Sequence, residues 1–249
     1  SSLDYNDAAD GVDRLDWNSA VDFDGDGAFE ALNPGSLLTD SADLLIDFES
    51  GLQFEVRGSV VGTGSYTTTK FATDQNVTYS EVLLRAGPVV LNGSAQFALS
   101  RWTLDVDVNG DGAITGDDLS GAQLDMIALS SGGLGVGIDG MLDLSVSGNL
   151  GLAKITAASE TEARYTGLKL GDVVVSTKLV AGDFGLTGNL NIDSLGYNGV
   201  ADGFDRLDWN NVVDLDSDGA FETLDPGLLL MGSPDLLVNF ESGLHFEVS

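Results

Sequence analysis

The chain has 249 residues, of which 40 are Asp or Glu and only 10 are Lys or Arg, so its formal net charge at pH 7 is -30. This charge excludes nucleic acid and anionic membrane surfaces as partners, because binding to either requires a basic surface. Hydrophobic residues make up 43% of the chain, enough to form a core, and no apolar run approaches the length of a membrane span, so we expect no membrane insertion.

The excess of acid has two explanations. Divalent cations bound in fixed numbers would partly neutralise it, or the carboxylates form a solvated surface of the halophile type. The chain also has no Cys. This fits a reducing cytosol, and it equally fits secreted bacterial proteins that use calcium rather than disulfides as cross-links.

An internal repeat divides the chain. Residues 2–56 and 194–248 align without a gap at an offset of 192, and 38 of the 55 pairs are identical. Such self-similarity is typical of repeat architectures. We therefore predict an acidic module at 1–57 (the copy-1 module), a β-rich central region of the same repeat at 58–193, and a second, truncated module at 194–249 (the copy-2 module).

Each acidic module carries a loop with the spacing of a calcium site. Side-chain oxygens fall at loop positions 1, 3 and 5, a Gly at position 6 allows the sharp bend, and a carbonyl follows at position 7. The usual closing Glu at position 12 is missing, so we expect the Glu at position 9 to bind directly. The predicted ligands are Asp22, Asp24, Asp26, Ala28 and Glu30 in copy 1, and Asp214, Asp216, Asp218, Ala220 and Glu222 in copy 2, with Asp13, Asp16, Asp205 and Asp208 as candidates to complete the shells.

The central region is dominated by a period of two. From Leu134 to Leu152 every even position is apolar or Gly, which predicts half-buried strand. A two-residue hairpin at 139–140 would place Val136 opposite Asp143 on the same face, which is unfavourable. Three-residue loops at 139–141 and 147–149 keep the apolar residues on one face, and so do a continuous strand or a solenoid turn. Further strands are predicted at 52–60, 81–86, 96–108, 123–129, 164–170, 173–179 and 184–192, and short helices or turns at 13–21, 34–38 and 42–48.

The third loop, 107–118, has the strongest calcium pattern. Oxygens fall at positions 1, 3 and 5, Gly112 is at position 6, and a carboxylate closes the loop at position 12. The alternative is an acidic β-turn, which Asn-Gly and Asp-Gly pairs favour. The predicted ligands are Asp107, Asn109, Asp111, the carbonyl of Ala113, Thr115 directly or through water, and Asp118.

These loops resemble those of EF-hand and dockerin-like proteins, although the strand-like segment 101–108 replaces the usual entering helix. This difference favours a static clamp over a conformational sensor. With its acidic, Cys-free repeat, the chain resembles segments of giant calcium-stabilised bacterial surface proteins such as adhesins and extracellular filaments. The resemblance implies an extracellular or cell-surface structural repeat that serves as a stalk, spacer or filament body, with Ca²⁺ bound and with neighbouring repeats or subunits as partners. The stretch 132–139 also resembles the calcium nonapeptide of RTX proteins, but Gly137 stands where that motif needs Asp, so we interpret it as strand.

The sequence does not predict an enzyme. His245 is the only His and is replaced by Gln53 in copy 1, and without Cys the usual nucleophilic triads cannot form. A glycoside hydrolase needs only two carboxylates and stays as a minor alternative. A carbohydrate- or surface-binding module is the second alternative, with Trp17, Trp102 and Trp209 as a stacking platform for glycans, although such aromatics more often anchor a core. The fold prediction is all-β, an elongated repeat architecture (β-solenoid or stacked β-sandwich-like) with acidic calcium loops and a few short helical turns.

Overall fold

A computed structural model describes most of the chain. The described residues are 2–8, 12–22, 26–30, 32–34, 45–62, 64–69, 76–86, 89–138, 142–181, 184–210, 212–215, 220–232 and 234–249. Among them, no helix is both long and apolar enough to cross a membrane.

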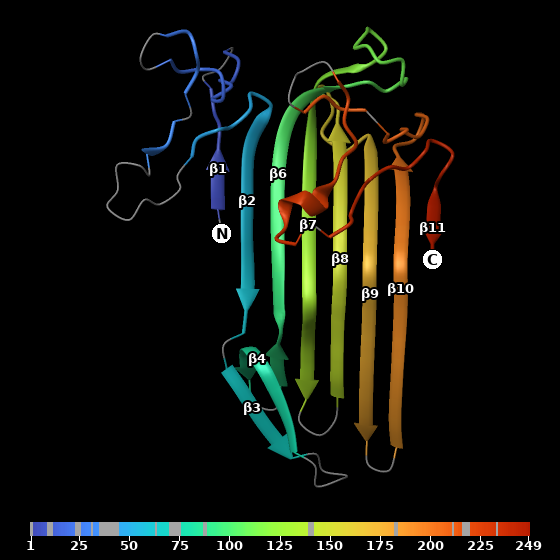
Figure 1. The fold of residues 1–249 in the computed structure, drawn as a ribbon. Helices are drawn as coiled ribbons and strands as arrows, with labels where there is room; N and C mark the ends of the chain where they lie inside the picture. The colour runs from blue at the N-terminus through green and yellow to red at the C-terminus, as the bar shows by residue number, and fades with distance from the viewer. Residues whose placement is uncertain are drawn as a thin grey trace.

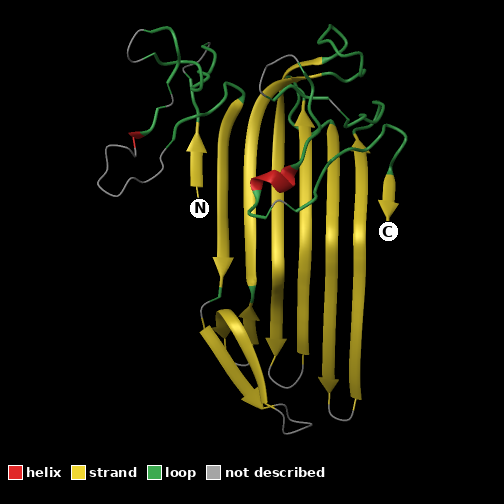
Figure 2. Ribbon diagram, viewed as in Figure 1, coloured by secondary structure: helices red, strands yellow, loops and turns green. Residues whose placement is uncertain are grey.

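Antiparallel strands dominate the described residues (Figures 1 and 2). Eight of them lie side by side in the order β1-β2-β6-β7-β8-β9-β10-β11, and β3, β4 and β5 form a branch that joins β7 through β5. The strands are β1 (Ser2–Tyr5), β2 (Leu52–Val61), β3 (Gly64–Thr69), β4 (Asn76–Ala86), β5 (Val89–Asn92), β6 (Ser94–Val106), β7 (Leu119–Ile138), β8 (Leu142–Thr156), β9 (Tyr165–Ala181), β10 (Phe184–Val200) and β11 (Phe246–Val248), with one 3-10 helix at Pro226–Leu229.

The prediction of a β-rich fold is confirmed: the described strands form one open, antiparallel sheet. The period-two segment supplies the end of β7 and most of β8. β7 ends at Ile138, which pairs with Leu142 at the start of β8, so three residues connect the strands. At 147–149 the chain does not reverse, because β8 runs through these residues. The choice between a solenoid and a sandwich stays a prediction.

A bulge in β7 keeps the apolar residues on one face of the sheet. Leu129 pairs with Leu150, and Leu134 pairs with Val146, with a register shift between Ser131 and Leu134. Leu150 and Val146 are four residues apart on β8 and share a face, so the bulge returns Leu134 to the face of Leu129. Apolar residues at odd positions before the bulge and at even positions after it therefore lie on the same face of the sheet.

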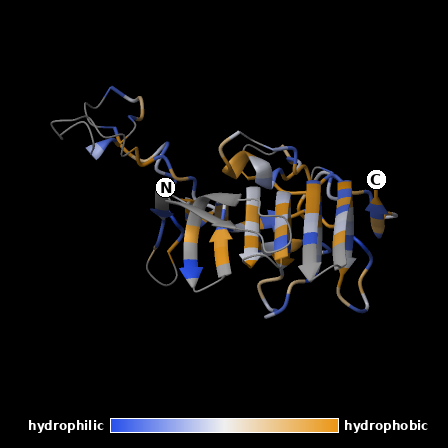
Figure 3. Cartoon of the chain, turned by 90° about the horizontal axis from the view of Figure 1, so that it is seen from below, coloured by the Kyte–Doolittle hydropathy of each residue, from blue (hydrophilic) through white to orange (hydrophobic). Residues whose placement is uncertain are grey.

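The core lies between the opposite face of the sheet and the copy-2 module, which folds back across strands β7–β9 (Figure 3). Two glycines make this close contact possible. A Cβ on Gly151 would lie 3.0 Å from Leu236 Cβ, and a Cβ on Gly167 would lie 2.6 Å from Val238 Cγ1. Burial of aromatic and branched side chains stabilises the contact. The largest fully buried side chains in the copy-2 module are Trp209, Leu207, Leu224, Leu236, Val212, Val213 and Val238.

The two acidic modules fold alike wherever both are described. Tyr5 of β1 pairs with Phe54 of β2, and Tyr197 of β10 pairs with Phe246 of β11, which is the same register displaced by 192 residues. A buried Asn organises each module. The Asn198 side-chain N–H groups donate to the carbonyls of Leu207 (2.9 Å) and Glu241 (3.2 Å), and its Oδ1 accepts from the Trp209 indole N–H (3.0 Å).

Asn6 makes the corresponding three bonds in the copy-1 module. Its side-chain N–H groups donate to the carbonyls of Leu15 (3.1 Å) and Glu49 (3.0 Å), and its Oδ1 accepts from the Trp17 indole N–H (3.3 Å). Each Asn therefore ties a strand to two distant loop segments. Sequence reasoning missed this role, although both Asn residues are identical between the copies and precede the Trp by the same interval.

The close contact at Gly167 gives a first prediction. Gly167→Ala places a methyl group against Val238 and the Trp209 ring, so the module must shift, and we expect a loss of about 1–3 kcal/mol in unfolding free energy. Gly171→Ala, on the same strand, is the matched control because its Cβ would meet only the Asp235 carbonyl oxygen at 3.6 Å. Denaturant titration of both variants measures the difference. Equal stabilities would show that the module does not press on β9.

Candidate metal centre

The loop with the strongest calcium pattern connects two neighbouring strands of the sheet. Residues 107–118 lie between β6 and β7, and the pair Val106–Leu119 closes the loop at its base. The loop follows a strand, as predicted, and not a helix. Gly112 has φ +80°, a conformation that side chains rarely adopt, so Gly at loop position 6 is needed for this bend.

Asp107 anchors the loop from inside. It is only 1% exposed, and its carboxylate accepts N–H groups from Gly110 (2.7 Å) and Gly112 (2.7 Å) and a longer one from Asp111 (3.3 Å). These bonds wrap the backbone around the carboxylate and compensate part of its loss of water. A buried carboxylate with backbone donors on one side is well placed to present its remaining lone pairs to a cation on the other.

Three carboxylates converge in this loop. Ligand oxygens of Asp107, Asp111 and Asp118 all lie within 4.8 Å of one another. Two oxygens bound to one calcium ion are at most about 5 Å apart, because each Ca–O distance is about 2.3–2.6 Å. The three acids therefore have the spacing of a common ion, and without a cation they repel one another.

The other predicted ligands of this loop make local hydrogen bonds. Asn109 Oδ1 accepts the Asp111 N–H (2.8 Å), and the Ala113 N–H donates to Asp111 Oδ1 (3.0 Å). The Thr115 hydroxyl donates to Asp118 Oδ2 (3.0 Å). Coordination by Asn109, by the Ala113 carbonyl and by Thr115 stays a prediction.

Asp118 is held in its charged form. Burial raises the pKa of this carboxyl, but hydrogen bonds from the backbone N–H of Thr115 (2.8 Å) and Val108 (2.9 Å), together with the Thr115 hydroxyl, outweigh burial and hold the pKa below its usual range. A carboxyl whose pKa is lowered on folding is ionised at neutral pH, which is the state that a metal ligand requires.

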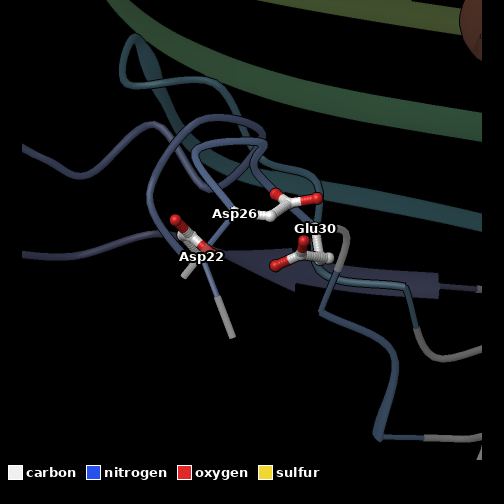
Figure 4. Close-up of side chains that lie close together, drawn as sticks. All are labelled: Asp22, Asp26 and Glu30. Carbon is white, nitrogen blue, oxygen red and sulfur yellow. The ribbon is translucent and has the colours of Figure 1, made fainter. Parts of the chain in front are cut away.

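The copy-1 loop brings three of its predicted ligands together (Figure 4). Ligand oxygens of Asp22, Asp26 and Glu30 also lie within 4.8 Å of one another. Asp22 accepts the Gly27 N–H (3.0 Å), and Asp26 accepts the Ala28 N–H (2.8 Å), as the acids of the central loop do. Glu30 at loop position 9 is the third member of this cluster, and its binding to a cation in place of the missing closing carboxylate stays a prediction. Asp24 lies outside the described residues.

The copy-2 loop is described only at its two ends. Asp216 and Asp218 lie outside the described residues, so their convergence with Asp214, the Ala220 carbonyl and Glu222 stays a prediction. Glu222 Oε2 accepts the Leu215 N–H (2.8 Å), and the Glu222 N–H donates to the Val213 carbonyl (2.6 Å). The Glu30 N–H bonds to the Val21 carbonyl in the same way (2.8 Å), so the two loops share the closure at position 9.

The central loop and the copy-2 loop are joined through the backbone. Val213 forms one bridge with Val106 and another with Glu222, and the Asp107 N–H donates to the Val212 carbonyl (3.0 Å). A cation in the central loop would therefore stiffen the junction between the sheet and the copy-2 module, and would not act on an isolated turn.

Other candidates have local roles. Asp16 accepts the Asn18 N–H (2.9 Å) and Asp208 the Asn210 N–H (3.1 Å), so these upstream acids stabilise turns, and neither they nor Asp13 and Asp205 belong to the carboxylate groups found among the described residues. Trp209 is 0% exposed, so it is not available to stack on a sugar. His245 is exposed and lies beside the Tyr197 ring.

No protein-family model, curated protein or solved structure matches the chain. The site consists of two groups of three carboxylates that could hold a metal ion, in loops that a network of backbone N–H groups preorganises.

The lowered pKa of Asp118 gives a second prediction. Stability from this carboxylate is fully present above its unfolded pKa and is lost as pH falls through the lower, folded pKa. Asp118→Asn should therefore reduce Tm at pH 7, and the difference from the parent chain should shrink as pH falls below the unfolded pKa and the Asp118 carboxylate takes up its proton. Thermal melts across this pH range measure it. A difference that does not depend on pH would assign the loss to altered hydrogen bonding rather than to charge.

Proposed function

We propose that this chain is an extracellular structural repeat stabilised by calcium, which serves as a stalk, spacer or filament body of a surface protein. The observation that carries the proposal is the convergence of Asp107, Asp111 and Asp118 in the loop that joins the sheet to the copy-2 module. Acids at loop positions 1 and 5 also converge in the copy-1 loop, where Glu30 at position 9 is the third member of the cluster.

Electrostatics supports a bound cation. The chain carries 40 acidic and 10 basic side chains, and the folded state brings three carboxylates together in each described cluster. A divalent ion in each cluster converts mutual repulsion into attraction and binds the folded state much more tightly than the unfolded chain. Folding and ion binding are then coupled, so that the ion acts as a cross-link.

The donor set favours calcium over other metals. All ligand atoms in both clusters are carboxylate oxygens, which suit hard cations. Zinc prefers Cys and His, but the chain has no Cys and only one His. Magnesium demands near-ideal octahedral geometry, which a loop with many flexible oxygen ligands does not impose. Calcium at millimolar concentration is a feature of extracellular surroundings, which fits the cell-surface assignment.

A melting experiment tests the proposal. With free calcium at about 100 times Kd, each site that binds only the folded chain adds about 2.7 kcal/mol of stability. We expect Tm to rise with millimolar calcium and to fall on addition of a chelator. An unchanged Tm would reject the calcium clamp, and stabilisation by molar monovalent salt alone would support the halophile-type surface instead.

Matched variants locate the effect. Asp111→Asn keeps a side-chain oxygen for the Ala113 N–H but removes the charge, so we expect it to lose much of the calcium-dependent rise in Tm. Asp117→Asn removes a charge from the same loop at an exposed residue outside the cluster and should retain the rise. Equal losses in both variants would indicate a diffuse charge effect with no defined site.

A further inference from the structure

The two acidic modules have the same fold but very different burial. Leu207 is 1% exposed, whereas its counterpart Leu15 is 48% exposed. Trp209 is completely buried, and its counterpart Trp17 is only half-buried. Val238 and its counterpart Ile46 differ in the same direction. The copy-1 module therefore presents, partly uncovered, the apolar side that the copy-2 module buries.

The copy-2 module shows what that side fits. It covers the face of strands β7–β9, where Gly151 and Gly167 leave room for Leu236, Val238 and Trp209. The first strand of the copy-2 module is the end of β10. The strands that the module covers, β7–β9, come before β10 both in the chain and in the strand order of the sheet. By analogy, the copy-1 module needs a sheet on the outer side of β1.

The strand register places that missing sheet. β1 corresponds to residues 194–197 of β10, and both strands pair with the same partner segment, β1 with β2 and β10 with β11. The other edge of β10 pairs with β9, Leu195 opposite Leu170. In the part of the chain that is described, β1 pairs with β2 alone. The copy-1 module extends beyond this edge, away from the sheet (Figures 1 and 3).

We propose that the copy-1 module docks on the β7–β9 face of a preceding copy of this repeat, with β1 continuing the β10 strand of that copy so that one sheet runs through both. This inference rests on the proposed structural role and specifies its partner. A separate second chain is a poor candidate for the occupant, because residues 194–248 already fill the corresponding place on its sheet. The partner of the copy-1 module is therefore a preceding repeat of the same chain, in which residue 193 is followed directly by residue 2 of the next repeat.

The opposite edge of the sheet fits the same arrangement. β11 corresponds to the start of β2, and β2 pairs on its other edge with β6, Phe54 opposite Arg101. Arg14 and Gln53 both contact the Thr103 hydroxyl on β6. Their counterparts, Arg206 and His245, would meet the equivalent strand of a following repeat. Each repeat then contributes β2, β6, β7, β8, β9 and β10 to the continuous sheet.

A chain duplicated in phase tests the inference. Residues 2–193 are joined directly to residues 2–249, so that Asp193 precedes Ser2 as it now precedes Ser194. Because the chain has no Cys, a single Leu15→Cys provides a unique thiol probe. In the second period we expect this thiol to lose the reactivity towards a thiol reagent that it shows in the 249-residue chain. The same substitution in the first period, where nothing precedes the module, should stay reactive.

Two further variants make the result decisive. Gly167→Ala in the first period obstructs the receiving face and should restore the reactivity of the second-period thiol. Asp4 stands where copy 2 has Gly196, over which Phe240 lies, so the measurement is repeated with Asp4→Gly in the second period. If the second-period thiol reacts as fast as the first-period thiol in both backgrounds, the docking proposal is wrong.

The outcome separates this inference from the proposed function. A calcium-dependent rise in Tm without protection of the second-period thiol would keep the calcium clamp and reject the continuous sheet. Protection of the second-period thiol in the presence of a chelator, with no calcium effect on Tm, would keep the continuous sheet and reject the calcium clamp.

Discussion

The buried amide of Asn198 is the interaction on which the architecture depends. Its three hydrogen bonds join the end of β10 to the Leu207 carbonyl, the Glu241 carbonyl and the Trp209 indole, and the side chain is completely buried. Loss of one partner would leave polar groups without compensation in an apolar environment. The amide thus determines how the chain leaves the sheet and turns back across it, and the apolar side of the copy-2 module is aligned with β7–β9 as a result.

The β6–β7 loop lies at the end of the sheet where this folding back occurs (Figure 1). The β6–β7 loop is bonded to the copy-2 module through Val212 and Val213, so the charge of Asp107, Asp111 and Asp118 is concentrated at a junction rather than at a free tip. Under the proposed function, ion binding and apolar packing stabilise the same contact. The two effects would reinforce one another, since the core holds the loop in position and the ion removes the repulsion that opposes the packing.

Much of the sheet was predictable from the sequence, because alternation of apolar and polar residues is a local property. The segment 134–152 shows the limit. Its alternation of apolar and polar residues fits a chain reversal at 147–149 as well as a continuous strand. In the structure, β8 continues through these residues. The convergence of acids in the acidic loops was also predictable, since the carboxylates are close in sequence, and Asp107, Asp111 and Asp118 converge as the spacing indicated. The difference in burial between Leu15 and Leu207 was not, because identical residues in identical local folds differ only in which distant strands lie beneath them.

The antiparallel ladders have a mechanical consequence. Hydrogen bonds between antiparallel strands run perpendicular to the strands, and so along the direction in which the sheet grows. In an array of the proposed kind, tension along this direction would open each ladder one rung at a time, as a zipper opens, instead of shearing all its bonds together. A strand occupies about 4.8 Å of the array, but the 17 residues of β9 extend to about 58 Å when released. Such a stalk would yield at low force and lengthen about twelvefold at each opened strand, so that it would absorb sudden loads without breaking the chain.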